Sequence, residues 1–271
     1  MTLRVELLTI GNEILSGHTL DTNSQWLAQR LLELNLPVNQ ILVIEDNVDL
    51  IASAIKASFD KQTTLLITSG GLGPTFDDLT AEGLALAIET PLQFNPAALA
   101  MVTNRYKELK AQGLVETGEI TPSRKKMARI PSNAIPLPNS VGTAPGIHLQ
   151  FHGTQIYCLP GVPQELFAVF MEAVAPQIAS LTDRVVLQQV IQVPILDESI
   201  LAPIIAVLMK ESQGVYLKSL PRPYQSRQPL HVAISVTAKT KTHAQKLLSE
   251  ITYKLKEIAY TQRQIELALD R

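Results

Sequence analysis

The chain has 271 residues, of which 46% are hydrophobic and 18% charged, a composition typical of one large or two ordinary folded domains. A formal net charge of -2 argues against a general nucleic-acid-binding protein, and the single cysteine, Cys158, excludes an internal disulfide framework. No apolar stretch is long enough to span a membrane and no basic leader precedes one, so the sequence predicts a soluble, cytoplasmic protein.

The N-terminal part alternates strand and helix patterns. Strands are predicted over 4–10, 38–44 and 64–68, and helices over 22–36, 47–58 and 81–89. Thr22 with Gln25 resembles a capping box, and Asn47 is expected to cap the second helix. This order predicts a largely parallel sheet in a three-layer α/β domain, with ligands bound beyond the carboxyl ends of its strands.

Further along, the chain becomes more irregular and then changes character. Helices are predicted over 96–112, 122–128 and 164–178, and a hairpin over 147–151 and 155–159. Beyond 181, strands over 184–193, 215–220 and 229–238 and helices over 198–210 and 242–259 predict a smaller α+β module. We therefore expect domains over 1–180 and 181–262, followed by a tail over 263–271.

A glycine loop after the third strand carries the strongest chemical signal. Gly70, Gly71 and Gly73 follow a buried apolar run and precede a helix, an arrangement in which backbone N–H groups approach a phosphate. Asp77 and Asp78 have the wrong sign to bind phosphate directly, so they indicate a cation such as Mg²⁺ between them and the phosphate. Thr80 is expected to cap the helix, which leaves both aspartates free for the site.

Other polar residues are expected to gather at the same edge of the sheet. Glu13, Asp46 and Asp78 all lie in loops that leave the carboxyl ends of predicted strands. Asp46 and Asp78 are the predicted metal ligands. Glu13, Asp78 and Lys126 are the predicted catalytic residues. Ser69, Gly70, Gly71, Gly73, Thr75 and Asn23 are the predicted substrate-binding residues. Hydroxyls in loops also commonly bond only to the backbone, and basic runs such as 124–129 are commonly solvated, so these structural roles stay open. Glu165 is read as an ordinary acid in the first turn of a helix.

Together, these segments resemble the CinA competence-damage family. The matching stretches are TIGNEILSG over 9–17, TSGGLGPTFDDLT over 68–80, NSVGTAPG over 139–146 and LPGVPQE over 159–165. They are similar to the N-terminal, molybdopterin-binding-like domain of that family, and the module after 181 is similar to its KH-like middle domain. Longer members carry a further C-terminal domain with nicotinamide mononucleotide deamidase activity. The sequence ends before such a domain, so we do not transfer that activity.

The resemblance implies hydrolysis of the pyrophosphate bond of ADP-ribose, with Mg²⁺, Mn²⁺ or Co²⁺ and in addition K⁺. Asp78-Leu79-Thr80 matches the Asp-Val-Thr of relatives that bind and adenylylate molybdopterin, and Asp46 matches their acidic position after the second strand. Two alternatives remain: a molybdopterin-binding adenylyltransferase-like protein, and a non-catalytic, competence-linked nucleotide-binding protein.

The second module lacks the feature with which KH domains bind RNA. They hold the RNA backbone with a Gly-x-x-Gly loop, and none occurs between 181 and 262. We expect a packing or homodimerisation role and no nucleic-acid or membrane partner. Tyr216, Arg222 and Tyr224 are expected to close over a neighbouring site.

Overall fold

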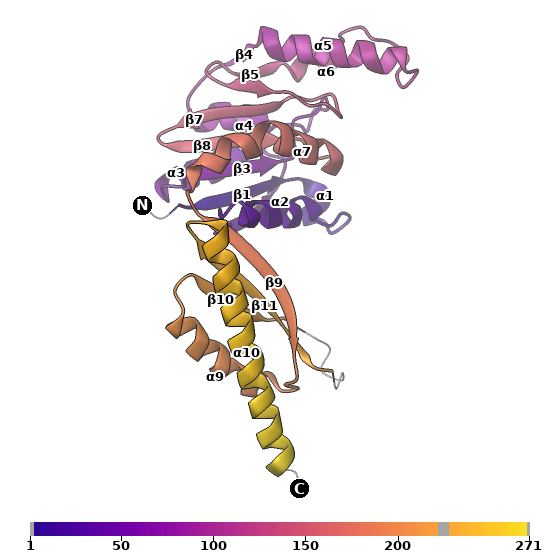
Figure 1. Ribbon diagram of the computed structural model, residues 1–271. Helices are drawn as coiled ribbons and strands as arrows, with labels where there is room; N and C mark the ends of the chain where they lie inside the picture. The colour runs from indigo at the N-terminus through magenta and orange to yellow at the C-terminus, as the bar shows by residue number, and fades with distance from the viewer. Residues whose placement is uncertain (1–2, 222–227, 270–271) are drawn as a thin grey trace. The chain divides into compact units, whose positions relative to one another are not determined.

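The computed structural model describes residues 3–221 and 228–269, which form two compact units (Figure 1). Most of the chain up to Leu181 belongs to the first unit, and the chain from Thr182 onward belongs to the second. Arg222 and Tyr224, which the sequence places near a site, lie outside the described residues.

A mixed, mostly parallel sheet forms the centre of the N-terminal unit. Its order is β2-β1-β3-β8-β7-β6. β2, β1, β3 and β8 run parallel, β7 is antiparallel to β8, and β6 is antiparallel to β7, so β7 alone runs against the other strands of this sheet. The bounds are β1 Val5–Ile10, β2 Gln40–Ile44, β3 Leu65–Ser69, β6 Ile135–Leu137, β7 Gly146–Phe151 and β8 Thr154–Leu159. The three-layer α/β class predicted from the alternating pattern is confirmed.

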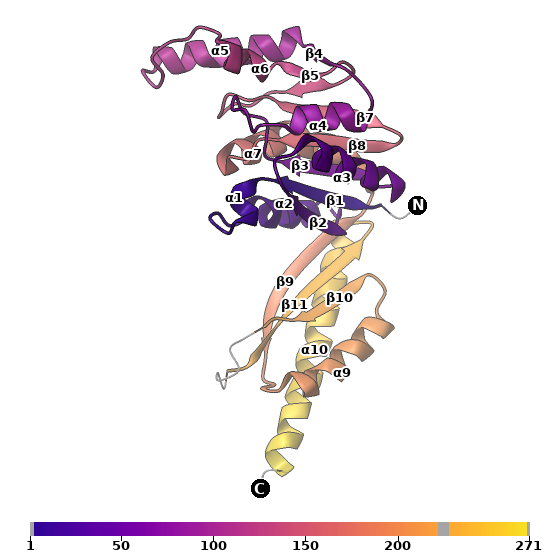
Figure 2. The ribbon, with the colours of Figure 1, turned by 180° about the vertical axis from the view of Figure 1, so that it is seen from behind.

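Helices cover both faces of this sheet (Figures 1 and 2). On one face lie α2 (Thr22–Glu33) and α7 (Pro163–Val169), where the ring of Trp26 stacks on Phe167 with centroids 4.2 Å apart. On the other face lie α3 (Val48–Asp60) and α4 (Thr80–Ala87). The stacked pair of Trp26 and Phe167 stabilises the contact between α2 and α7 by more than the burial of apolar area alone.

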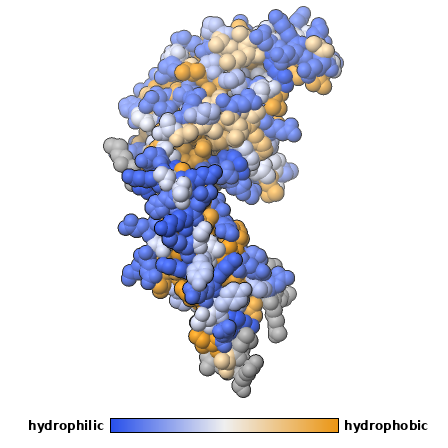
Figure 3. Space-filling model, in the orientation of Figure 1, coloured by the Kyte–Doolittle hydropathy of each residue, from blue (hydrophilic) through white to orange (hydrophobic). Residues whose placement is uncertain are grey.

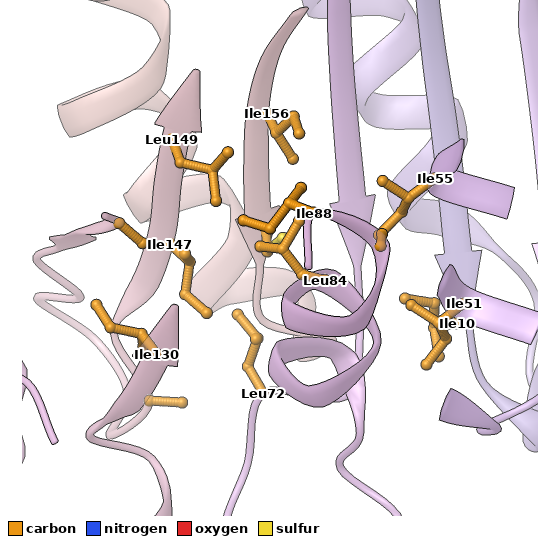
Figure 4. Packing of buried hydrophobic residues seen from close by; sticks show 14 of the residues in the cluster. Ile10, Ile51, Ile55, Leu72, Leu84, Ile88, Ile130, Ile147, Leu149 and Ile156 are labelled. Atoms are coloured by element: carbon orange, nitrogen blue, oxygen red, sulfur yellow. The ribbon is translucent and has the colours of Figure 1, made fainter. Parts of the chain in front are cut away.

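The main core lies between α3, α4 and the sheet (Figure 4). Ile51 of α3, Leu84 of α4 and Ile147 of β7 are buried in it. Leu72 belongs to the same cluster although it lies in the glycine loop, and it is only 7% exposed. Burial of Leu72 in the core therefore fixes the position of the glycine loop, because moving the loop away would expose this side chain to water.

Several elements differ from the sequence-based predictions. Short strands β4 (Leu92–Phe94) and β5 (Arg129–Pro131) pair with each other, and no strand was predicted at either of them or at β6. A short helix α1 (Asn12–Leu15) occupies an expected loop. The remaining helices are α5 Pro96–Ala111 and α6 Pro122–Lys126. The predicted single helix over 164–178 is α7, a π-helical turn over Phe170–Val174, and α8 Ala175–Ile178, followed by a 3₁₀ turn over Ala179–Leu181. Strands of three residues leave too short a periodic pattern to be recognised.

Helix caps were predicted with mixed success. Asn47 caps α3 as expected, with its side chain accepting from the N–H groups of Asp49 and Leu50. The capping box at Thr22 is wrong: Asp21 Oδ1 accepts from the N–H of Ser24 at 2.9 Å, so the cap lies one residue earlier. The second oxygen of Asp21 bonds the Thr9 hydroxyl, which ties the helix start to β1.

The second unit consists of an antiparallel sheet, order β10-β11-β9, with two helices. Its elements are β9 Val185–Val193, α9 Glu198–Glu211, β10 Val215–Ser219, β11 Leu230–Ala238 and α10 Lys241–Leu269. Alternate residues of β11 are buried, so one sheet face packs on the helices. The last helix was expected to end near Ala259. It continues through the described part of the predicted tail because no Gly or Pro interrupts it.

Within residues 3–221 and 228–269, no helix is both long and apolar enough to cross a membrane. Hydrophilic residues are spread over the face drawn in Figure 3, with hydrophobic ones between them.

Candidate functional site

The glycine loop leaves β3 beside the end of β1. Gly70 has φ +102°, and a Cβ placed there would lie 2.2 Å from the carbonyl oxygen of Ile10. Gly71 also has a positive φ, +66°. A side chain at Gly70 would therefore be strained and would collide with the backbone of Ile10. A side chain at Gly71 would also be strained, and its Cβ would lie 2.4 Å from the Thr80 hydroxyl oxygen. The end of β1 lies so close to Gly70 that this contact alone explains a glycine there, whether or not a ligand also approaches the loop.

Two side chains fix the shape of the loop. The Thr80 hydroxyl donates to the Gly70 carbonyl oxygen at 2.7 Å, and this side chain is buried. The Lys126 ammonium donates to the carbonyl oxygens of Thr75 and Asp78, both at 2.6 Å. The predicted capping role of Thr80 is therefore wrong: the structure places Thr80 inside the first turn of α4, and its hydroxyl bonds back to the loop.

The two aspartates close the loop on itself. Asp78 Oδ2 accepts from the N–H of Thr75 at 2.7 Å and from its hydroxyl at 2.6 Å. The Thr75 hydroxyl also contacts Asp77 Oδ1, and this contact is the largest influence lowering the pKa of Asp77. A short turn therefore holds both carboxylates at the edge of a cavity.

Glu13 and Asp46 reach the same region from neighbouring strands. Asp46 Oδ2 accepts from the N–H of Asn12 at 2.8 Å, which links the segments that follow β2 and β1. Burial raises the pKa of Asp46, and the negative charges of Glu13, Asp77 and Asp78 raise it further, against the effect of the Asn12 hydrogen bond. These carboxylates therefore share one electrostatic environment, in which a bound cation would relieve their repulsion.

A cavity of about 420 Å³ opens at this edge of the sheet. It is lined by Ile10, Glu13, Asp46, Gly70, Gly71, Leu72, Gly73, Pro74, Thr75, Asp77, Asp78, Thr143, Ala144, Pro160, Gly161, Val162 and Glu165. All the parallel strands lead into it, since Glu13 follows β1, Asp46 follows β2, Gly70 follows β3 and Pro160 follows β8. Among the described residues that line it, none carries a basic side chain, so the cavity is strongly acidic. Its size suits a small-molecule ligand.

The other predicted site residues lie around the cavity without lining it. The Ser69 hydroxyl is buried and donates to the Thr9 hydroxyl. Asn23 donates from its amide to the carbonyl oxygen of Gly161, which lies on the cavity wall. Lys126 lines a much smaller neighbouring hollow together with Gly71, Gly73 and Asp78. Asn23 and Lys126 therefore bond backbone carbonyls of the site, whereas the Ser69 hydroxyl bonds a neighbouring side chain.

Glu165 is a cavity residue that the sequence reading assigned to helix electrostatics. Asn139 donates to its Oε2 at 2.7 Å, and a Cβ on Gly142 would lie 1.8 Å from its carboxyl carbon. Burial raises the pKa of Glu165, while the Asn139 hydrogen bond and the charge of Arg105 lower it. The same Arg105 donates to the carbonyl oxygens of Val141 and Gly142, so it holds the loop that lies over Glu165. The sequence signals were the two family-like stretches, 139–146 and 159–165, in which Asn139, Gly142 and Glu165 lie.

Carboxylate oxygens are suitable ligands for a hard divalent cation, but these carboxylates do not surround a complete cation site. Among the described residues, no group of three His, Cys, Asp or Glu side chains is close enough to hold a metal ion alone. Mg²⁺ is commonly bound by one or two carboxylates, with water and substrate phosphates completing its octahedron. An open acidic edge is compatible with that mode of binding.

The fold and the site together define an α/β domain with an acidic ligand cavity at the carboxyl edge of a mostly parallel sheet. Residues 6–180 match the family described as "Probable molybdopterin binding domain", and the chain belongs to that family. It is a CinA-like member. The crystal structure of the CinA protein of unknown function from Thermoplasma acidophilum is 36% identical, with a TM-score of 0.58 over 65% of this chain and 98% of that one.

Curated relatives extend the likeness beyond the first unit. Protein SSO0103 of Saccharolobus solfataricus is 36% identical over 251 residues, which cover 92% of this chain and 89% of its own length. Protein PF0476 of Pyrococcus furiosus is 40% identical over 205 residues, covering 76% and 80% respectively. The KH-like assignment of the second unit stays a prediction.

Proposed function

We propose that the chain is a metal-dependent hydrolase that cleaves the pyrophosphate bond of ADP-ribose or a related nucleotide diphosphate. The observation that carries this proposal is the acidic cavity at the carboxyl edge of the sheet, where the glycine loop meets Glu13, Asp46 and Asp78. A diphosphate ligand needs both a backbone cradle and a cation to enter such a cavity.

The glycine loop supplies the proposed phosphate contacts. Within the described residues, no hydrogen bond to another residue uses the backbone N–H of Leu72 or Gly73, so these donors are available to an anion. Lys126 was expected to touch a phosphate directly. Because its ammonium bonds two loop carbonyls, we assign it the role of holding the loop in this shape.

The carboxylates supply the proposed cation and water contacts. Asp46 and Asp78 are the proposed ligands of Mg²⁺, Mn²⁺ or Co²⁺, which would offset charge on the phosphate oxygens during attack by water. Glu13 lines the cavity and is exposed, which suits a residue that orients the attacking water and accepts its proton. A role for K⁺ belongs to the same proposal.

Product analysis tests this function. Incubation with ADP-ribose and each divalent metal should release AMP and ribose 5-phosphate. Asp78→Asn and Asp46→Asn should each abolish most of the release, whereas Asp60→Asn, an exposed carboxylate at the end of α3, should leave it unchanged. Full activity in Asp78→Asn would overturn the site assignment.

A second candidate is adenylyl transfer to a pterin, supported by the description of the matching family. It predicts transfer of AMP from ATP to molybdopterin and no release of ribose 5-phosphate from ADP-ribose. A non-catalytic nucleotide-binding protein would bind nucleotides, raise its melting temperature and convert none of them. The homodimer, the absence of nucleic-acid and membrane partners and the cytoplasmic location remain part of the proposal.

A further inference from the structure

The cavity is lined by both acidic and apolar residues. Its acidic residues are Glu13, Asp46, Asp77, Asp78 and Glu165. Its large apolar residues and prolines are Ile10, Leu72, Pro74, Pro160 and Val162. A simple phosphate would need only the first set with a cation. The second set indicates a ligand that also carries an apolar part.

Phe76 lies in the turn of the glycine loop beside this cavity, and its side chain is in solvent. It is 91% exposed, the highest exposure among the large hydrophobic residues that the structure describes. Its chain neighbours Thr75 and Asp77 both line the cavity, so the Phe76 Cα lies one residue step, about 3.8 Å, from each of theirs. Val162, on the cavity wall itself, is 54% exposed.

The segment that carries Phe76 is held from both ends. Asp78 Oδ2 accepts from the N–H and the hydroxyl of Thr75, and Lys126 bonds the carbonyl oxygens of Thr75 and Asp78. These contacts close a short turn whose tip is Phe76. A ring on a turn fixed in this way loses little further backbone freedom when a ligand packs on it.

We propose that Phe76 is the stacking platform for the flat aromatic ring of the ligand, a nucleobase or a similar fused heterocycle, whose phosphates occupy the acidic cavity. The inference rests on the proposed function for the phosphate and adds the part of the ligand that selects nucleotides over other diphosphates. A ligand with a ring and a phosphate matches both the exposed aromatic side chain and the acidic cavity beside it. Stacking on an aromatic side chain is tolerant of which base is presented.

Calorimetric titration in the presence of Mg²⁺ tests the proposal independently of hydrolysis. The probes are α,β-methylene-ADP, which carries a base and a bond resistant to hydrolysis, and methylenediphosphonate, which has no base. Wild type should bind the first more tightly. Phe76→Ala should weaken α,β-methylene-ADP about tenfold to a hundredfold and leave methylenediphosphonate unchanged. Phe76→Trp should retain the affinity, and Phe94→Ala, a half-exposed phenylalanine that does not line the cavity, is the matched control.

Several results would overturn the proposal: equal affinity of Phe76→Ala and wild type, equal weakening for both probes, or no binding of either probe. A change of oligomeric state in Phe76→Ala at unchanged affinity would instead assign this side chain to contact with a second copy. If ADP-ribose is not hydrolysed and Phe76-dependent binding is still measured, the hydrolase proposal fails and the stacking role stands. If ADP-ribose is hydrolysed and Phe76→Ala has an unchanged KM, the stacking role fails and the hydrolase proposal stands.

Discussion

Gly70→Ala should be the most damaging glycine substitution in the glycine loop. A φ of +102° strains an alanine by about 1–3 kcal/mol. Its Cβ would also lie 2.2 Å from the Ile10 carbonyl oxygen, and overpacking against backbone costs about a further 1–3 kcal/mol. The sum is about 2–6 kcal/mol of unfolding free energy. Gly113 is the control that separates backbone strain from collision: its φ is +71°, and nothing lies within 4 Å of an added Cβ. Gly113→Ala should cost only about 1–2 kcal/mol.

The single tryptophan makes this comparison specific to the N-terminal unit. Trp26 stacks on Phe167, so its fluorescence should change when α2 and α7 separate. Urea denaturation followed at this signal gives the unfolding free energy of each variant. If Gly70→Ala costs no more than Gly113→Ala, the close approach of the loop to β1 is not a constraint, and the account of why the loop needs glycine is wrong.

Three other substitutions test the site residue by residue. Asp46→Asn should stabilise the metal-free protein at neutral pH: the folded-state pKa of Asp46 is raised, so its ionisation costs stability as pH rises through that pKa. The gain in unfolding free energy, measured by urea denaturation, should disappear below about pH 4, where Asp46 is protonated in both states. A variant less stable than wild type at neutral pH would contradict the inferred repulsion between Asp46 and the neighbouring carboxylates. Thr80→Val should cost about 1–3 kcal/mol by leaving the Gly70 carbonyl unpaired, whereas Thr80→Ser should cost much less; equal losses in urea would refute the bond's role. Lys126→Met should weaken Mg²⁺-dependent binding of α,β-methylene-ADP by about tenfold through loss of loop shape, and unchanged affinity by calorimetry would remove Lys126 from the site.

The sequence was sufficient to predict that Glu13, Asp46 and Asp78 line the same cavity. Each follows a parallel strand, and the carboxyl ends of parallel strands lie at one edge, so the order of elements alone brings them together. The start of α4 was predicted at Ala81, one residue after its position in the structure, and the role of the Thr80 hydroxyl was not predicted. That role depends on the loop turning back over α4, which no local pattern encodes.

Contacts between distant segments explain what sequence reasoning missed. Glu165 belongs to the cavity because Asn139 binds its carboxylate and Arg105 holds the loop above it, and these residues come from three separate parts of the chain. The acid in a first turn has an ordinary local explanation, so only the fold reveals its second role. Likewise the sequence places Phe76 in the glycine-loop motif, and its exposure follows only from the fold of the turn.

Metal-assisted cleavage of a phosphoanhydride in the acidic cavity is the activity proposed for this chain. The most direct measurement is a ³¹P NMR time course of ADP-ribose with the full chain, with and without Mg²⁺, Mn²⁺ or Co²⁺. We expect the two diphosphate resonances to be replaced by two monoester resonances, those of AMP and ribose 5-phosphate, only when a divalent metal is present. Diphosphate resonances that persist unchanged with every metal would contradict it.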